Sequence, residues 1–290
     1  MKNKAASRLL LDMNRWGIDV FDEFGRYDYV NTQTILPTHT HPGMIEICYL
    51  AKGSQKYFVG DRKYRLYGGD LFVTFPDEVH GTGEVPEEKG VLYWLVLKRP
   101  EAGKDYMGLD YADACSLFAK LSELPERQFK GGAECGCLLR KIVQLFYSDR
   151  DELAKMELEN LLVSFLLVVV RAGQHAHMRI YSKRMVGMME YIEKNLSKTI
   201  DLDKLADKCN LSLSRFKHLF KEETGIPPSE YIMRKKMECA QALLEAQGAI
   251  VKDIAYGLGF SSPAYFSTVF KQYNGCSPTE YLKNKKGKKE

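Results

Sequence analysis

The chain has 290 residues, of which 45% are hydrophobic and 28% charged, and its 42 Lys+Arg against 38 Asp+Glu give a net charge of +4. This composition is typical of a folded globular protein of about two domains and excludes disordered and fibrous chains. No apolar run is long enough for a membrane span, Met1 begins no recognisable secretory leader, and seven scattered cysteines indicate no disulfide framework. We therefore expect a cytoplasmic protein with reduced thiols and no membrane partner.

The charge is distributed unevenly along the chain. Residues 183–290 hold 19 Lys+Arg and 13 Asp+Glu, a net charge of +6, whereas residues 1–182 have a net charge of −2. A basic segment of this kind favours an anionic partner such as nucleic acid. Part of the excess lies in the lysine-rich tail, which on its own is typical of a solvated terminus.

The first hundred residues predict short strands separated by turns. Residues 45–50 alternate with the period of a strand, and the segments 55–59 and 62–67 flank Gly60-Asp61, which is a hairpin signal. No helical period intervenes, and this favours a small β-barrel or sandwich.

Three histidines and a glutamate in this segment resemble the two sequence motifs of the cupin barrels. The first motif contains His39, His41 and Glu46, and the second ends at His80. His39 and His41 are two residues apart and share one face of a strand, whereas Glu46 has the opposite parity unless Pro42-Gly43 resets the strand.

The resemblance predicts a cupin-like, effector-sensing barrel over residues 1–105. Three imidazoles and one carboxylate suit Zn, Fe, Mn or Ni with positions open to a ligand. The alternative is a polar pocket in which the same side chains hydrogen-bond a sugar or another small molecule, so that no cofactor is required. The predicted effector-binding residues are His39, His41, Glu46, His80, Tyr49 and Trp94, and the first four are also the predicted ligands of a divalent metal.

After Pro100 the hydrophobic period becomes helical. The ranges 112–121, 134–147 and 155–172 space Leu, Val, Phe and Ile as helices do. The last of these is apolar on most faces from 161 to 170, so it is either buried in its own domain or packed against another protomer. We predict that residues 106–180 form a helical dimerisation region and linker, and that the chain is a homodimer.

Residues 181–290 are helical throughout and contain an internal repeat. Ala206 matches Ala255 at an offset of 49, and the phenylalanines that follow match at an offset of 50. Each copy has a short helix, a left-handed turn position (Asn210 or Gly259) and a second amphipathic helix, which is a helix-turn-helix. A helical bundle for protein contacts is the alternative, but it explains neither the repeat nor the basic charge.

The stretch 254–278, Ile-Ala-Tyr-Gly-Leu-Gly-Phe-Ser-Ser-Pro-Ala-Tyr-Phe-Ser-Thr-Val-Phe-Lys-Gln-Tyr-Asn-Gly-Cys-Ser-Pro, closely resembles the signature of the AraC/XylS family. The resemblance implies an α+β multidomain protein with an all-α DNA-binding domain of two helix-turn-helix units at residues 181–290. Double-stranded DNA, a small-molecule effector such as a sugar, and RNA polymerase are the partners it implies.

The resemblance places the DNA contacts on the second helix of each unit. In the first unit Lys217 can read guanine and Arg215 can contact phosphate. In the second, Pro263, Ala264 and Thr268 are poor hydrogen-bonding side chains. This unit would therefore have to recognise DNA through thymine-methyl contacts, phosphate contacts and DNA shape. The predicted DNA-binding residues are Ser212, Ser214, Arg215, Lys217, His218, Lys221, Ser262, Ala264, Ser267, Thr268 and Lys271.

These observations predict a ligand-responsive, sequence-specific DNA-binding transcription regulator that activates carbohydrate-utilisation genes and is not an enzyme. One alternative is a metal-dependent cupin enzyme that carries a DNA-binding tail, for which only Glu46 and the histidines are candidate acids or bases. The other alternative is a repressor that responds to no effector.

Overall fold

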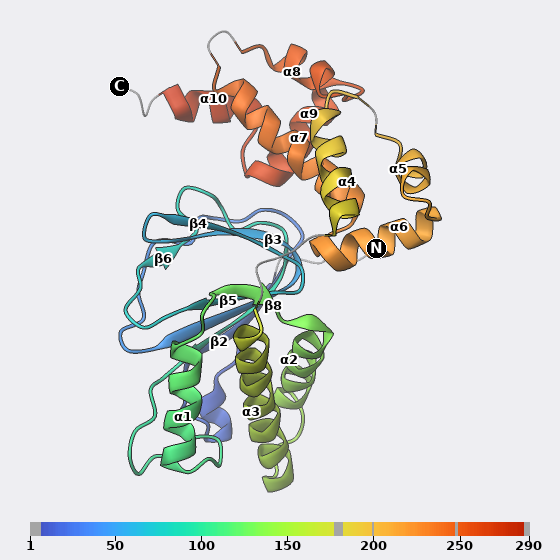
Figure 1. The fold of residues 1–290 in the computed structure, drawn as a ribbon. Coiled ribbons are helices and arrows are strands. Elements are labelled where there is room, and N and C mark those ends of the chain that lie inside the picture. The colour runs from blue at the N-terminus through green and yellow to red at the C-terminus, as the bar shows by residue number, and fades with distance from the viewer. Residues whose placement is uncertain (1–6, 177–181, 199, 247–248, 287–290) are drawn as a thin grey trace. The chain divides into compact units, whose positions relative to one another are not determined.

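The computed structural model describes residues 7–176, 182–198, 200–246 and 249–286. The chain divides into two compact units, the first from residues 1–30 and 35–179 and the second from residues 31–34 and 180–290. Figure 1 shows the strands and α1–α3 in the first unit and α4–α10 in the second. Among the described residues, no helix has both the length and the apolar character needed to cross a membrane.

The first unit is built on an antiparallel sheet in the order β1-β2-β7-β3-β5-β8, with β4 and β6 also paired to β3. The strands are β1 (Ser7–Leu10), β2 (Phe21–Tyr29), β3 (Ile45–Val59), β4 (Arg62–Tyr67), β5 (Asp70–Thr74), β6 (His80–Gly81), β7 (Gly90–Leu97) and β8 (Gln128–Lys130).

Strand β3 belongs to both layers of this barrel. Its first half, 45–50, pairs with β5 and β7, and its second half, 54–59, pairs with β4. A register shift between Leu50 and Lys52 marks the change, since a bulge bends a strand and increases its twist. The predicted hairpin at Gly60-Asp61 is confirmed, because Val59 pairs with Arg62 across that turn.

The alternation of side chains along β3 separates two apolar cores. Ile45, Ile47 and Tyr49 belong to the larger core, which the sheet shares with the helices. Cys48 and Leu50 point the other way, into a smaller core inside the barrel.

Three helices cover the outer face of the sheet: α1 (Tyr111–Ser122), α2 (Gly132–Phe146) and α3 (Glu152–Gln174). Asp110 and Asp151 cap α1 and α3 by accepting hydrogen bonds from Asp113 N (2.8 Å) and Ala154 N (2.7 Å). The three helices predicted from the hydrophobic period are therefore confirmed. A 3-10 turn at Met13–Trp16 and the strands β1 and β2 were not predicted.

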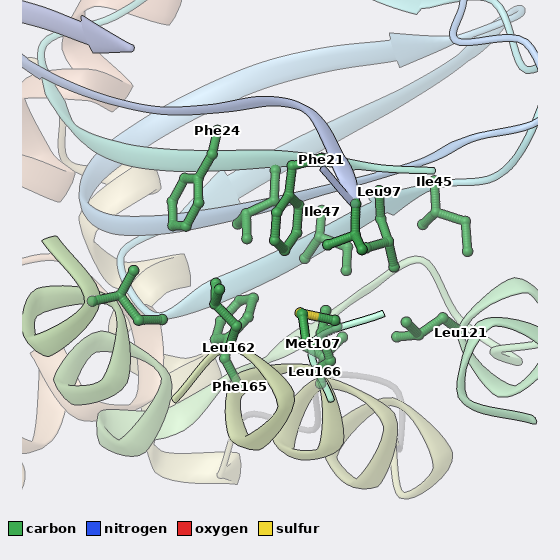
Figure 2. Packing of buried hydrophobic residues seen from close by; sticks show 14 of the residues in the cluster. Phe21, Phe24, Ile45, Ile47, Leu97, Met107, Leu121, Leu162, Phe165 and Leu166 are labelled. Atoms are coloured by element: carbon green, nitrogen blue, oxygen red, sulfur yellow. The ribbon is translucent and has the colours of Figure 1, made fainter. Parts of the chain in front are cut away.

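Most apolar residues of α3 between 161 and 170, which we call its apolar wall, face the sheet of their own chain. Leu162, Phe165 and Leu166 are fully buried, and Figure 2 shows them opposite Phe21 and Ile47 of the sheet. The wall therefore gives no support to a contact with another protomer, although the prediction of a dimer from the sequence rests on it. The helices expected as a separate region over 106–180 share their core with the barrel.

The second unit is all helical. Its helices are α4 (Lys183–Lys194), α5 (Leu202–Lys208), α6 (Leu213–Thr224), α7 (Pro228–Leu244), α8 (Val251–Gly257), α9 (Pro263–Asn274) and α10 (Pro278–Lys286). The pairs α5–α6 and α8–α9 are the two helix-turn-helix units, and α7 links them.

The turns and caps of the two units match the predictions from sequence. Asn210 (φ +54°) and Gly259 (φ +70°) adopt the left-handed conformation in the two tight turns. Ser212 and Ser262 cap α6 and α9 through hydrogen bonds from Arg215 N (3.3 Å) and Tyr265 N (3.2 Å). The four phenylalanines predicted as core are buried: Phe216, Phe220, Phe266 and Phe270.

We predict that Leu166→Ala lowers the free energy of unfolding by about 2–5 kcal/mol, because it leaves a cavity between α3 and the sheet. Leu167→Ala is the matched control, since this neighbour is 39% exposed and its loss changes stability by less than about 1 kcal/mol. Urea unfolding of the full chain followed by tryptophan fluorescence measures both, because Trp16 and Trp94 lie in the first unit. Equal effects of the two substitutions would contradict this packing.

Candidate functional site

Four side chains meet at the edge of the barrel, as the sequence predicts. The potential ligand atoms of His39, His41, Glu46 and His80 all lie within 4.8 Å of one another. His39 and His80 are joined by two backbone hydrogen bonds of 2.9 and 3.0 Å, which hold the ends of both motifs together. Gly43 (φ +66°) forms the turn that follows His41, so the reset of strand parity before Glu46 is confirmed.

Glu46 and His80 form the buried centre of this cluster. The carboxylate Oε2 lies 2.8 Å from His80 Nε2, and both side chains are more than nine-tenths buried. Burial opposes charge on each, but the mutual hydrogen bond prevails and lowers the pKa of Glu46 while it raises the pKa of His80. Burial lowers the pKa of His41. The pair is therefore best described as a carboxylate facing an imidazolium.

The imidazole orientations fit a metal ion. His39 Nδ1 lies 2.8 Å from Pro37 O and His80 Nδ1 lies 2.9 Å from Glu78 O. Histidines that bind metals commonly donate one ring N–H to a carbonyl and present the other nitrogen to the ion. The donor set thus suits a divalent ion once Nε2 of His80 has lost its proton.

Three members of the cluster, His39, His41 and Glu46, form one wall of a cavity of about 260 Å³ inside the first unit. Glu23 Oε2 accepts a hydrogen bond from Trp94 Nε1 (2.9 Å), and Arg8 lies 3.2 Å from Glu87 and 4.4 Å above the Trp94 ring. A Cβ at Gly25 would lie only 2.1 Å from the Trp94 ring, so glycine is required beneath the indole. The cavity lining is Arg8, Glu23, Leu36, Pro37, His39, His41, Glu46, Tyr57, Glu87, Leu92 and Trp94.

Two predicted effector-binding residues do not line the cavity, His80 and Tyr49. His80 is buried behind Glu46, to which it is paired. Tyr49 belongs to the core beneath the helices, where its hydroxyl donates to Gly132 O (3.2 Å) and burial raises its pKa to about 12. Tyr49 is three residues after Glu46 on the same strand, and side chains at odd spacing point to opposite faces. The prediction of Tyr49 as an effector contact is therefore corrected.

The second helices of the two helix-turn-helix units, α6 and α9, are the recognition helices, and they expose different side chains. On α6 the predicted residues Ser214, Arg215, Lys217, His218 and Lys221 are all exposed. On α9 the exposed members are Ala264, Thr268 and Lys271, and Tyr265, which was not predicted, is 51% exposed. Ser267 is half-buried and donates its hydroxyl to Pro263 O (2.8 Å), which leaves it poorly placed for a phosphate.

Two family models match the two units. The model described as an AraC-like ligand binding domain matches residues 20–119, and the model described as a helix-turn-helix domain matches residues 205–284. The chain belongs to the AraC family. It is a transcription regulator that joins a ligand-binding domain to a DNA-binding helix-turn-helix domain.

Individual relatives agree with this assignment. The chain is 27% identical over 247 residues to the HTH-type transcriptional regulator YfiF of Bacillus subtilis, covering 82% of this chain and 75% of that one. It is 23% identical over 243 residues to the HTH-type transcriptional activator RhaR of Escherichia coli, covering 82% and 84%.

Among solved structures, the C-terminal domain of AraT, a response regulator from Geobacillus stearothermophilus, is 30% identical with a TM-score of 0.34, and the match covers 36% of this chain and 86% of that one. ToxT of Vibrio cholerae is 17% identical with a TM-score of 0.35 over 90% and 96% of the two chains.

The cavity of this AraC-family chain includes four polar residues that sequence reasoning missed: Arg8, Glu23, Tyr57 and Glu87. Tyr57 could have been found, because its strand range was predicted and its parity places it inside the barrel. Arg8 and Glu23 lie on β1 and β2, two strands that were not predicted, and Glu87 lies in the loop before β7.

We predict that Glu46→Gln lowers the free energy of unfolding by about 1–3 kcal/mol, because buried His80 loses its charged acceptor. The matched control is Glu101→Gln, whose carboxylate is 61% exposed and pairs with Lys104, so a change within about 0.5 kcal/mol is expected. Thermal unfolding with a chelator present removes any contribution from metal ions. A Glu46→Gln protein as stable as the control would contradict the buried ion pair.

Proposed function

We propose that the chain activates carbohydrate-utilisation genes in the cytosol and that its effector is a small polyhydroxylated molecule bound inside the barrel. The cavity of about 260 Å³ carries this proposal. Its size suits an effector no larger than a simple sugar, since sites for drug-sized ligands begin near about 300 Å³. Activation, rather than repression, is supported by the similarity to RhaR of Escherichia coli, which is named a transcriptional activator.

The lining of the cavity matches the chemistry of a sugar. Carboxylates accept hydrogen bonds from hydroxyl groups, and three of them, Glu23, Glu46 and Glu87, line the cavity. The Trp94 ring offers an apolar face, although Arg8 already lies above that ring. A sugar that stacks on Trp94 would either displace the guanidinium or bind against its edge.

We also propose that a divalent metal can occupy the cluster, held by His39, His41, Glu46 and His80. The observation that favours this is the pair of ring nitrogens whose partners are carbonyl oxygens, which leaves Nε2 of His39 and His80 directed at the cluster. A metal bound there would supply a Lewis acid for hydroxyl groups of the effector. We propose no catalytic role for the cluster, in keeping with the regulator family to which the chain belongs.

Footprinting of the full chain on the DNA upstream of its own gene, with and without a panel of sugars, tests the effector proposal. We predict that one sugar changes protection and that His41→Ala removes the change, because the cavity loses a polar wall. Tyr49→Phe is the matched control: it removes a hydroxyl outside the cavity and keeps the response.

The same variant separates the two versions of the site. If a metal is resident, chelation destabilises the wild-type protein and has no effect on His41→Ala. If hydroxyl groups alone bind, chelation changes neither protein. A variant with all four cluster residues replaced that still responds to the sugar would refute both versions.

We further propose that the chain acts as a homodimer and contacts RNA polymerase when bound to DNA. The outer face of α3 supports a contact between copies, because Leu153 (76%), Met156 (63%) and Leu167 (39%) are exposed on it at near-helical spacing. We predict a dimer in sedimentation of the full chain and a monomer for Met156→Glu. Leu243→Glu, an exposed apolar residue of the second unit, is the control; a wild-type monomer at micromolar concentration would refute the dimer.

A further inference from the structure

The two recognition helices, α6 and α9, lie at equivalent positions of the repeat but differ in their outward side chains. At the offset of 50 residues, five outward positions of α6 correspond to five positions of α9. The first helix has hydrogen-bonding or cationic side chains at all five. The pairs are Ser214 with Ala264, Arg215 with Tyr265, Lys217 with Ser267, His218 with Thr268, and Lys221 with Lys271.

The serine and threonine hydroxyl groups of α9 are engaged within the helix itself. Thr268 Oγ1 donates to Ala264 O (3.1 Å), and Ser267 Oγ donates to Pro263 O (2.8 Å). Ser262 Oγ accepts the capping hydrogen bond from Tyr265 N (3.2 Å). With its hydroxyl turned back to the helix, Thr268 directs a methyl group outward.

The outward face of α9 is consequently apolar at its N-terminal end. Ala264 and Thr268 are both exposed and one helical turn apart, so their methyl groups lie on one stripe. Tyr265, beside this stripe, keeps an exposed ring, and Lys271 is the exposed cation one turn further along. The N-terminal residues of a recognition helix are the ones that contact base edges in the major groove.

We propose that α9 recognises thymine through its C5 methyl groups and makes no hydrogen-bonded contact with base edges. The methyl groups of Ala264 and Thr268 contact thymine methyls, while Lys271 binds phosphate. The half-site under α9 is then rich in A·T pairs, and the half-site under α6, read by Lys217, contains the required guanine. This inference rests on the DNA-binding function of the chain and names the bases that its second unit reads.

The first test changes only the DNA. Duplexes selected by the full-length protein from a random pool are resynthesised with deoxyuridine in place of single thymines, which removes one methyl group and no hydrogen-bonding atom. We expect each substitution under α9 to weaken binding about three- to five-fold and those under α6 to have no effect. Lys217→Ala identifies the α6 half-site, because it relaxes sequence preference only there, whereas Lys271→Ala weakens binding to all duplexes alike.

The second test separates the methyl group of Thr268 from its hydroxyl. Thr268→Val keeps the methyl, and we expect it to bind like wild type and to respond equally to deoxyuridine. Thr268→Ser keeps the hydroxyl, and we expect it to bind about three- to five-fold more weakly and to be insensitive to deoxyuridine at the contacted position.

The opposite pattern, with Thr268→Ser normal and Thr268→Val impaired, would overturn the proposal in favour of a hydroxyl contact. Specific binding that no deoxyuridine changes would overturn the thymine contact and leave DNA binding intact. If the protein selected no sequence from the pool, the failure would instead lie with sequence-specific binding itself.

Discussion

The alternation of side chains along β3 is the constraint on which the first unit depends. This strand is the only one of the described strands that pairs with four others. Its register therefore determines which side chains point into the barrel and which point toward the helices. Ile45 and Ile47 lie under the helices, and the alternating residues Glu46 and Cys48 point inside the barrel. A slip of one residue would bury the carboxylate under α3 and expose two isoleucines to the cavity.

Glu46 is therefore held inside the barrel, where burial of a charged carboxylate is unfavourable, and neighbouring groups offset this desolvation cost. His80 supplies the counter-charge at 2.8 Å, and its other ring nitrogen is held by Glu78 O. The backbone bridge between His39 and His80 brings the two motifs together although they are far apart in sequence. The same compensation leaves a polar wall that a metal or hydroxyl groups can use, so stability of the barrel and capacity for a ligand rest on the same residues.

Much of this could be predicted from the sequence, and the failures have identifiable causes. The repeat, the left-handed turn at Asn210 and the capping serines are local signals, and they gave the DNA-binding unit nearly residue by residue. The cluster of four residues was predicted because the spacing of the two cupin-like motifs indicates which side chains lie together in the fold. Tyr49 was wrongly predicted at the cavity, although its odd spacing from Glu46 on the same strand already indicates the opposite face. Arg8 and Glu23 could not be placed, because only strand pairing brings β1 and β2 beside Trp94.

The same reasoning explains how a duplicated unit can diverge without losing its fold. The buried residues of α6 and α9 include two equivalent pairs of phenylalanines, and both helices start at a capping serine and end at a left-handed glycine. Packing and capping therefore constrain the inward positions and the two ends, whereas the outward positions are mostly exposed. At those positions the first copy has mainly cationic side chains, whereas Ala264 and Thr268 of the second offer methyl groups and the hydroxyls of Ser267 and Thr268 are satisfied by the helix. Two copies of one scaffold can thus divide the work on DNA, because hydrogen-bonded and apolar contacts distinguish different bases.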